Sequence, residues 1–256
     1  MNVTTYTPPA DIDARRTRAL IVGVVGLVAV TAWAATNPMA RTRVMTQLKA
    51  SAVQHIGHVH TEGNYARSKA LAEQLVLAQA PADMAVAVVR PHLVWGPGDA
   101  QLVGPIVARA RKGRLVLIDH GRALVDTLYV DNAGPAIAQA LERAHLTEVD
   151  RRPLVVTNAE PRTLAELVEG ICRASGTAGP RRSLPYPIAR LAGYGVEHAW
   201  QLLGRTDDPP VTRFLAEQLA TAHWFDQRRT REVLDWTPSV SIDEGLHRLA
   251  AYYRAR

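Results

Sequence analysis

Tyr65 and Lys69 are the residues whose types and spacing most directly suggest chemistry. They lie four residues apart in Tyr65-Ala-Arg-Ser-Lys69, inside a segment whose pattern predicts a helix over Tyr65–Ala80. Side chains four apart on a helix share a face. A cation beside a phenol favours the phenolate and so lowers the pKa of the hydroxyl. Because such a tyrosine can exchange a proton with a substrate hydroxyl or carbonyl, the pair predicts general acid/base chemistry.

A second segment, from Val88 to Asp99, predicts the wall of a site. Its first part belongs to Ala85–Val94, which has the pattern of a continuous apolar strand in a sheet covered on both faces. The strand leads into Gly96-Pro97-Gly98-Asp99, whose glycines and proline favour a turn. Turns that follow buried strands often carry binding residues. We therefore expect the site near the end of this strand.

The elements that would position these residues alternate between strand and helix as far as about Pro180. Such alternation predicts an α/β fold with parallel strand pairing. After Pro180 the pattern becomes mostly helical. The remaining predicted helices are 101–111, 132–143, 163–175, 188–203, 210–222, 227–234 and 241–253, and the remaining predicted strands are 116–118, 127–130 and 153–157.

Two of these helices carry further local signals. Thr163 with Glu166 three residues later is a capping box, and Gly176 is placed to end the same helix. The helix that carries Tyr65 has apolar residues expected to face a core. They are Ala70, Leu71, Leu75 and Leu77.

The chain divides into a predicted leader, 1–60, and a domain, 61–256. Within the leader, Ala19–Ala35 is a stretch of 17 residues without charge. One interpretation is a membrane helix at the short end of the usual range of about 17–25 residues, which would give membrane contact. Another is a signal peptide. The third is a degenerate nucleotide turn, in which Gly23 and Gly26 approach a pyrophosphate.

Composition argues against several other classes of protein. The net charge is +6, but the basic residues are scattered among acids rather than gathered in one block, so we expect no nucleic-acid binding. Cys172 is the only cysteine, which excludes an intrachain disulfide and predicts a small core residue. His55, His58 and His60 do not match the spacing of a common metal site, so we expect no metal.

Several motifs, in order, resemble the extended short-chain dehydrogenase/reductase superfamily (NAD-dependent epimerases and dehydratases). The similarity is greatest to its 3β-hydroxysteroid dehydrogenase/isomerase-like branch. The motifs are Tyr65-x-x-x-Lys69 with Ala72-Glu73, Arg90-Pro91-x-x-Val94-x-Gly96-Pro97-Gly98-Asp99, Gly121-Arg-Ala-Leu-Val-Asp-Thr-Leu-Tyr129-Val-Asp-Asn132, Val156-Thr-Asn-Ala-Glu160-Pro-Arg-Thr163 and the ending from Trp224 to Leu246. The resemblance runs from about Asn64 to the C-terminus.

This resemblance implies a fold and roles for individual residues. It implies an incomplete Rossmann-like parallel sheet with a mostly helical C-terminal substrate lobe. Tyr65 would be the general acid/base, and Lys69 would bind the nicotinamide ribose. Pro91, His92 and Val94 would line the nicotinamide pocket. Because Tyr65 stands early in the chain, we expect most of the N-terminal dinucleotide-binding half to be missing.

The function implied is an NAD- or NADP-dependent oxidoreductase that interconverts a hydroxyl and a ketone on a hydrophobic, steroid-like substrate. One alternative is a remnant without cofactor or catalysis, anchored to a membrane. Another is a nucleotide-sugar epimerase or dehydratase, with Arg122 and Arg213 as phosphate contacts. A third is that residues before about 60 have no evolved fold. We expect a cytoplasmic protein, membrane-associated if 19–35 is an anchor, and a homodimer is a further expectation.

Overall fold

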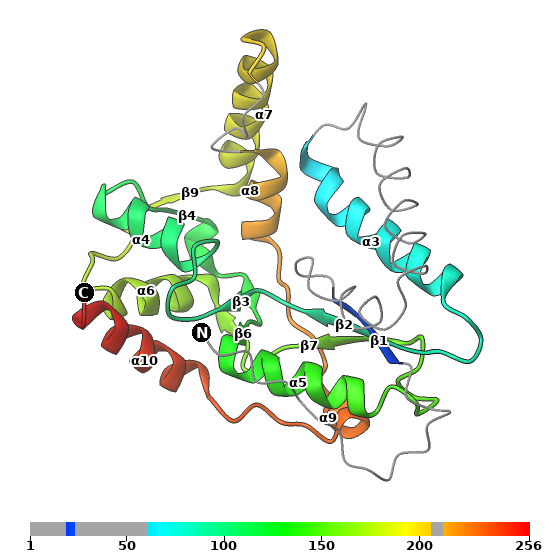
Figure 1. Ribbon diagram of the computed structural model, residues 1–256. Coiled ribbons are helices and arrows are strands. Elements are labelled where there is room, and N and C mark those ends of the chain that lie inside the picture. Colours follow the sequence, from blue (N-terminus) through cyan, green and yellow to red (C-terminus); the bar gives the residue numbers. More distant parts are fainter. Residues whose placement is uncertain (1–18, 24–60, 206–211) are drawn as a thin grey trace.

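Strand β2 is the centre of a three-stranded parallel sheet with the order β1-β2-β7 (Figure 1). The computed structural model describes residues 19–23, 61–205 and 212–256, and describes side chains from Ser68 onward. The elements are β1 (Ala19–Gly23), α3 (Thr61–Gln79), β2 (Ala85–Pro91), β3 (Val94–Trp95), α4 (Val103–Arg111), β4 (Val116–Ile118), η1 (Asp119–Gly121), β5 (Leu124–Val125), β6 (Leu128–Tyr129), α5 (Val130–Glu142), β7 (Pro153–Val156), β8 (Arg162–Thr163), α6 (Leu164–Ala174), β9 (Arg182–Leu184), α7 (Tyr186–Leu202), α8 (Arg213–Ala220), α9 (Arg228–Leu234) and α10 (Ile242–Arg254).

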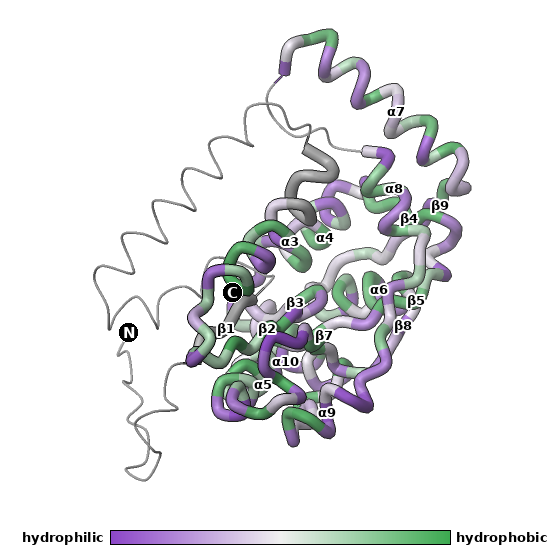
Figure 2. Tube along the Cα trace, turned by 90° about the vertical axis from the view of Figure 1, so that its right-hand side faces the viewer, coloured by the Kyte–Doolittle hydropathy of each residue, from purple (hydrophilic) through white to green (hydrophobic). Residues whose placement is uncertain are grey.

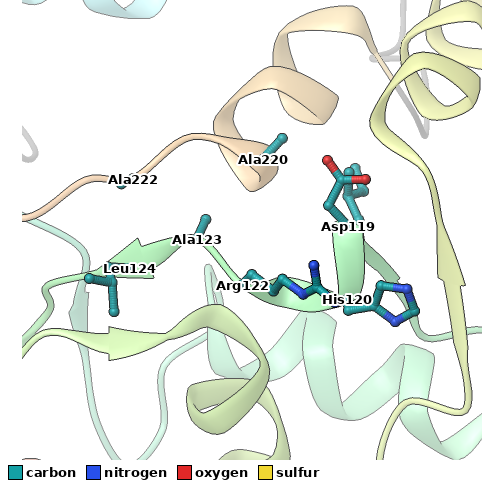
Figure 3. Close-up of a pocket in the computed structure, with 8 residues that line it drawn as sticks. Asp119, His120, Arg122, Ala123, Leu124, Ala220 and Ala222 are labelled. Atoms are coloured by element: carbon teal, nitrogen blue, oxygen red, sulfur yellow. The ribbon is translucent and has the colours of Figure 1, made fainter.

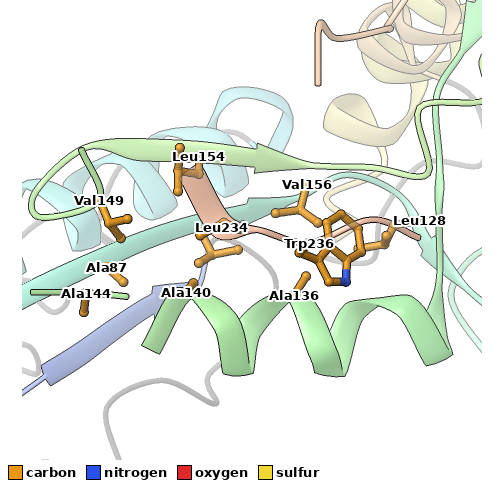
Figure 4. Close-up of a cluster of buried hydrophobic side chains, with 11 residues drawn as sticks. Ala87, Leu128, Ala136, Ala140, Ala144, Val149, Leu154, Val156, Leu234 and Trp236 are labelled. Carbon is orange, nitrogen blue, oxygen red and sulfur yellow. The ribbon is translucent and has the colours of Figure 1, made fainter. Parts of the chain in front are cut away.

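Successive residues of β2 point to opposite faces of the sheet, and each face is covered by helices. Val86 and Val88 pack against α3. Ala87 and Val89 pack instead into a cluster with α5 and α9, which includes Trp236 (Figure 4). All four β2 residues are fully buried. The α/β class with parallel pairing, and a central strand buried on both faces, are therefore confirmed.

The strand predicted over Ala85–Val94 is interrupted. β2 ends at Pro91, and Leu93 has a left-handed backbone with φ of 44°, which an extended strand does not allow. The chain then starts β3, which pairs in parallel with β6 instead of continuing the main sheet. This turn carries Trp95 into a different core, where its Nε1 donates to the Thr127 hydroxyl at 2.9 Å.

A second core lies beside the sheet, between α4, α6 and α10. Trp95 and Tyr129 are at its centre, with ring centroids 5.3 Å apart in an edge-to-face arrangement. The capping box that begins α6 is confirmed, because Glu166 N donates to Thr163 Oγ1 and Thr163 N donates to Glu166 Oε2. Cys172 is buried as predicted, and burial raises the pKa of its thiol.

The C-terminal lobe combines β9, α7 and α8 with β4 from the middle of the chain; in it β4 pairs in parallel with β9 and α7 packs against α8. Ile118, Ala189 and Ala216 form its small core. Helix α7 extends away from the rest of the molecule (Figure 1), and its Leu191 and Leu202 are 71% and 88% exposed. Figure 2 shows apolar and polar residues alternating along this helix.

The first five residues of the apolar leader stretch form β1, paired with β2 in register from Ala19–Ala85 to Gly23–Val89. Residues 24–35 lie outside the described part of the chain, as do His55, His58 and His60. The three interpretations of the stretch therefore stay predictions. Within the part of the chain that the structure describes, no helix is both long enough and apolar enough to cross a bilayer.

Candidate active site

Helix α3 runs antiparallel to β2. This orientation determines which part of the strand each turn of the helix lies beside. Near the end of the helix, Val76, Leu77 and Ala80 pack against the cluster of Met84, Val86 and Val88, which begins just before the strand. One turn earlier in the helix, Glu73 pairs with Arg90, close to the end of the strand. The turns that precede Glu73 are therefore directed toward the carboxyl end of the sheet. In open α/β sheets this is the edge at which ligands bind.

The Glu73–Arg90 ion pair fixes this placement. Arg90 Nε donates to Glu73 Oε2 at 3.0 Å and Arg90 Nη2 donates to Oε1 at 2.7 Å, which is the bidentate geometry that guanidinium and carboxylate favour. The Glu73 side chain is only 10% exposed. Lys69 stands one turn before Glu73 and is half-buried. Arg90 thus holds α3 at the turn that follows Lys69.

The inward face of α3 differs from the predicted one. Leu77 does face the core, but Ala70 and Leu71 are exposed, the latter by 36%. The buried side includes Glu73 instead, since its charge is satisfied by Arg90. The sequence contained a signal for this pair, an acid on the helix and an arginine at the end of an apolar strand.

Tyr65 belongs to α3 by its backbone, four residues before Lys69. Its side chain lies outside the described part of the structure. The contact between the Tyr65 hydroxyl and Lys69 therefore stays a prediction.

Pro91, His92 and Val94 lie together where the main sheet ends. The His92 backbone N–H donates to Val156 O at 3.1 Å, which extends the pairing of β2 with β7 by one residue. The His92 ring Nδ1 lies 2.7 Å from Asp126 O. A carbonyl oxygen only accepts, so Nδ1 carries the proton and Nε2 of the neutral ring is an acceptor.

Aromatic rings surround His92 on the side of the C-terminal lobe. The Phe225 ring meets it edge-on, with centroids 5.0 Å apart, and the His223 ring lies at 6.1 Å. Burial lowers the pKa of the His92 imidazole, and a positive charge on nearby His223 would lower it further. His92 is therefore a neutral group that presents a hydrogen-bond acceptor.

Asp126 is the residue at this edge that the sequence reasoning overlooked. It is fully buried, and burial raises the pKa of its carboxyl. Its Oδ2 accepts from the Thr157 hydroxyl at 2.6 Å, and its Oδ1 accepts from Glu160 N at 3.3 Å. Its backbone bonds to both His92 and His223. An acid inside the apolar stretch 124–130 was the available signal.

The Gly-Pro-Gly-Asp turn has a structural role. The carboxylate of Asp99 accepts backbone N–H groups from Gln101, Leu102 and Val103 at 2.7 to 3.0 Å, and so satisfies the start of α4. A Cβ on Gly96 would lie 2.5 Å from Val130 Cγ1 and 3.2 Å from Val130 Cβ, so a larger residue there would require the Val130 side chain to move.

A pocket of about 520 Å³ opens in the C-terminal lobe next to this edge (Figure 3). Its lining is Ile118, Asp119, His120, Arg122, Ala123, Leu124, Ala220 and Ala222. Leu124 is an apolar part of this lining. Leu191 and Leu202 of α7 are exposed and lie outside it.

The two arginines named for a nucleotide-sugar substrate have different surroundings. Arg122 lines the pocket. Arg213 is held by Glu197 through its Nε at 2.7 Å and lies over the Tyr194 ring at 5.3 Å. Among the described residues there is no group of histidine, cysteine and acidic side chains that could hold a metal ion.

Comparison with known proteins shows the family to which the chain belongs. Residues 39–186 match the 3-beta hydroxysteroid dehydrogenase/isomerase family. The chain is 43% identical over 188 residues to a 2-alkyl-3-oxoalkanoate reductase of Stenotrophomonas maltophilia, covering 73% of this chain and 57% of that protein. It is 29% identical over 197 residues to the decarboxylating sterol-4-alpha-carboxylate 3-dehydrogenase of Saccharomyces cerevisiae, covering 73% and 56%. The chain thus spans little more than half the length of these relatives.

Solved structures show the same fold. The crystal structure of gox2253 superposes with a TM-score of 0.57 at 19% identity, over 78% of this chain and 59% of that one. The epimerase Mth375 of Methanothermobacter thermautotrophicus gives a TM-score of 0.53 at 15% identity, over 77% and 52%. The expected resemblance is confirmed on more than half of the chain: this protein belongs to the 3-beta hydroxysteroid dehydrogenase/isomerase family.

Proposed function

We propose that this protein is an NAD(P)-dependent oxidoreductase that interconverts a hydroxyl and a ketone on a hydrophobic substrate. The single observation that carries the proposal is the Glu73–Arg90 clamp, because it ties the helix of Tyr65 and Lys69 to the carboxyl end of β2, beside Pro91 and His92. Relatives that are named reductases and dehydrogenases support the same class of reaction.

The residues at this edge suit the nicotinamide end of a dinucleotide. Lys69 would bind the ribose, and Pro91, His92 and Val94 would line the ring. When bound, the cofactor supplies or accepts the hydride. Tyr65 would give a proton to the substrate oxygen during reduction and take it back during oxidation. The His92 Nε2 acceptor and the surrounding rings would orient polar groups and exclude water.

For the substrate we propose a 3-oxo carboxylic acid with alkyl chains rather than a steroid alone. The relative from Stenotrophomonas maltophilia is named for a 2-alkyl-3-oxoalkanoate, and the yeast relative for a 3-dehydrogenase acting on a sterol carboxylate. Both names place the reacting carbon close to a carboxylate. The pocket beside the site combines apolar walls with one arginine, which fits such a molecule.

The test uses the full chain with NADH or NADPH and a 2-alkyl-3-oxoalkanoate, and follows nicotinamide absorbance. We expect turnover by the wild type and a loss of at least about a hundredfold in kcat for Tyr65→Phe, because general acid/base catalysis contributes about 10²–10⁴-fold. Tyr252→Phe, which removes the hydroxyl of a tyrosine on α10, is the matched control and should keep the wild-type kcat.

Two results would overturn this function. One is equal turnover by the wild type and Tyr65→Phe. The other is the absence of saturable change in nicotinamide fluorescence up to millimolar NADH and NADPH, which would favour the cofactor-less remnant. With binding established, hydroxysteroids and nucleotide sugars tested in the same assay separate the remaining substrate classes.

A further inference from the structure

Arg122 is the arginine of a pocket lining that also holds Asp119, His120 and five apolar residues. The apolar lining comes from two segments of the chain, 118–124 and 220–222, and includes Ile118, Leu124 and Ala220. Figure 3 shows the Arg122 side chain between Ala123 and His120, with Asp119 above it. A wall of this composition suits a ligand that has an alkyl part and an anionic group.

The backbone that carries Arg122 is firmly held. Gly121 has φ of +64°, and a Cβ there would lie 2.8 Å from Ala165 N at the start of α6. Only glycine therefore lets this short helix sit so close to α6. The Arg122 N–H donates to Asp119 O, which closes the helical turn. The backbone at Arg122 is thus held in place, while the Arg122 side chain itself is exposed.

The carboxylates near the pocket do not form an ion pair with Arg122 among the described residues. Arg90, Arg162 and Arg213 each form an ion pair with a carboxylate at 2.7 to 2.9 Å. Arg122 has no such partner among the residues that the structure describes. Asp119, which shares the pocket, is engaged elsewhere because its Oδ1 accepts from the Tyr186 backbone N–H at 2.8 Å.

The pocket adjoins the edge of the sheet where the chemistry is proposed. Its Leu124 accepts a backbone hydrogen bond from His223 at 2.7 Å, and the ring of His223 lies 6.1 Å from that of His92. Ala222, another lining residue, directly precedes His223. A ligand in the pocket would therefore contact residues that adjoin His223, whose ring lies beside that of His92.

We propose that Arg122 is the specificity-determining residue that binds the carboxylate of an acidic, alkyl-bearing substrate. The alkyl part lies against Ile118, Leu124 and Ala220. This inference rests on the proposed function for its biological meaning, but the pocket can be tested without turnover. A phosphate-bearing substrate would offer an anion as well, and the test below distinguishes it.

The experiment titrates the full chain with decanoate, with decanol and with UDP-glucose by isothermal calorimetry, without cofactor. We expect decanoate to bind the wild type and to bind Arg122→Gln about ten- to a hundredfold more weakly, since a charge-assisted hydrogen bond is lost. Arg122→Lys should recover part of this affinity. Decanol, which has no charge, should bind both proteins equally.

Arg109→Gln is the matched control, because Arg109 is an exposed arginine on α4 outside the pocket. It should bind decanoate like the wild type. Decanoate affinity that is undetectable in the wild type, or equal in the wild type and Arg122→Gln, overturns the proposal. Binding of UDP-glucose that depends on Arg122 and exceeds that of decanoate overturns it in favour of a nucleotide sugar.

These outcomes are separate from the failure of the proposed function. A chain that binds decanoate through Arg122 but reduces no ketone would keep the pocket assignment and lose the reductase. A chain that reduces the 3-oxo acid while Arg122→Gln leaves KM unchanged would keep the reductase and lose the assignment of Arg122.

Discussion

His92 is surrounded by the Asp126 carbonyl and by the rings of His223 and Phe225, and burial lowers the pKa of its imidazole. A histidine with a folded-state pKa below its unfolded value stabilises the fold above about pH 6.5. That stability is lost as the pH falls through the lowered folded-state pKa. We predict that His92→Asn, whose amide can still donate to Asp126 O, loses less stability than the wild type between about pH 7.5 and pH 5. Urea unfolding at each pH measures this difference.

His145→Asn provides the comparison for this prediction, because it removes an exposed imidazole outside the site. It should lose as much stability on acidification as the wild type does. An identical pH dependence for the wild type and His92→Asn would mean that the surroundings of His92 do not favour its neutral form. The sequence named His92 through a motif, but its partners His223 and Phe225 come from a distant loop that no local pattern connects to it.

At the scale of secondary-structure elements, the Glu73–Arg90 ion pair determines how α3 lies on β2. Glu73 is 8% exposed, and removing the charge of one partner leaves the other without its counterion in a partly buried place. We predict that Glu73→Gln lowers the free energy of unfolding by about 1–3 kcal/mol. Coupling to Arg90→Gln in a double-mutant cycle should account for most of that loss. Denaturant unfolding of the four proteins gives both values.

The exposed pair Asp226–Arg228 serves as the reference, since Arg228 is 91% exposed. Asp226→Asn should change stability much less than Glu73→Gln does, because solvent screens a surface ion pair. If Glu73→Gln were equally mild, the ion pair would not be what fixes α3. If Glu73→Gln also raised KM for the nicotinamide cofactor, this would support a role of the Glu73–Arg90 pair in positioning Lys69.

Local elements were predictable where the signal itself is local. The capping box of Thr163 and Glu166 depends on residues three apart, and the sequence located it correctly. β4 was likewise predicted with its observed bounds, 116–118. The break after Pro91 was not predictable, because it depends on Trp95 reaching the second core. Two-residue strands such as β5 and β8 are too short to leave a periodic pattern.

At the scale of the whole molecule, two cores meet along β3 and β6, and α10 closes the second of them. The alternation of strand and helix in the sequence predicted an α/β fold with parallel pairing, but strand order and helix contacts depend on residues far apart. Gly245 on α10 shows this dependence. It lies against Tyr129 and Trp95, both at most 1% exposed, although nothing near it in the sequence indicates such neighbours.

A methyl group at Gly245 tests how tightly α10 fits. Its Cβ would lie 2.6 Å from Tyr129 Cδ2 and 3.2 Å from Trp95 Cη2, and neither ring has room to move. We predict that Gly245→Ala lowers the free energy of unfolding by about 1–3 kcal/mol, since overpacking outweighs the better helix propensity of alanine. Gly195→Ala on α7 meets no atom within 4 Å and should instead add about 1 kcal/mol. Thermal and urea unfolding of both variants should show opposite signs, and a stabilised Gly245→Ala would mean that α10 lies farther from β6 than described.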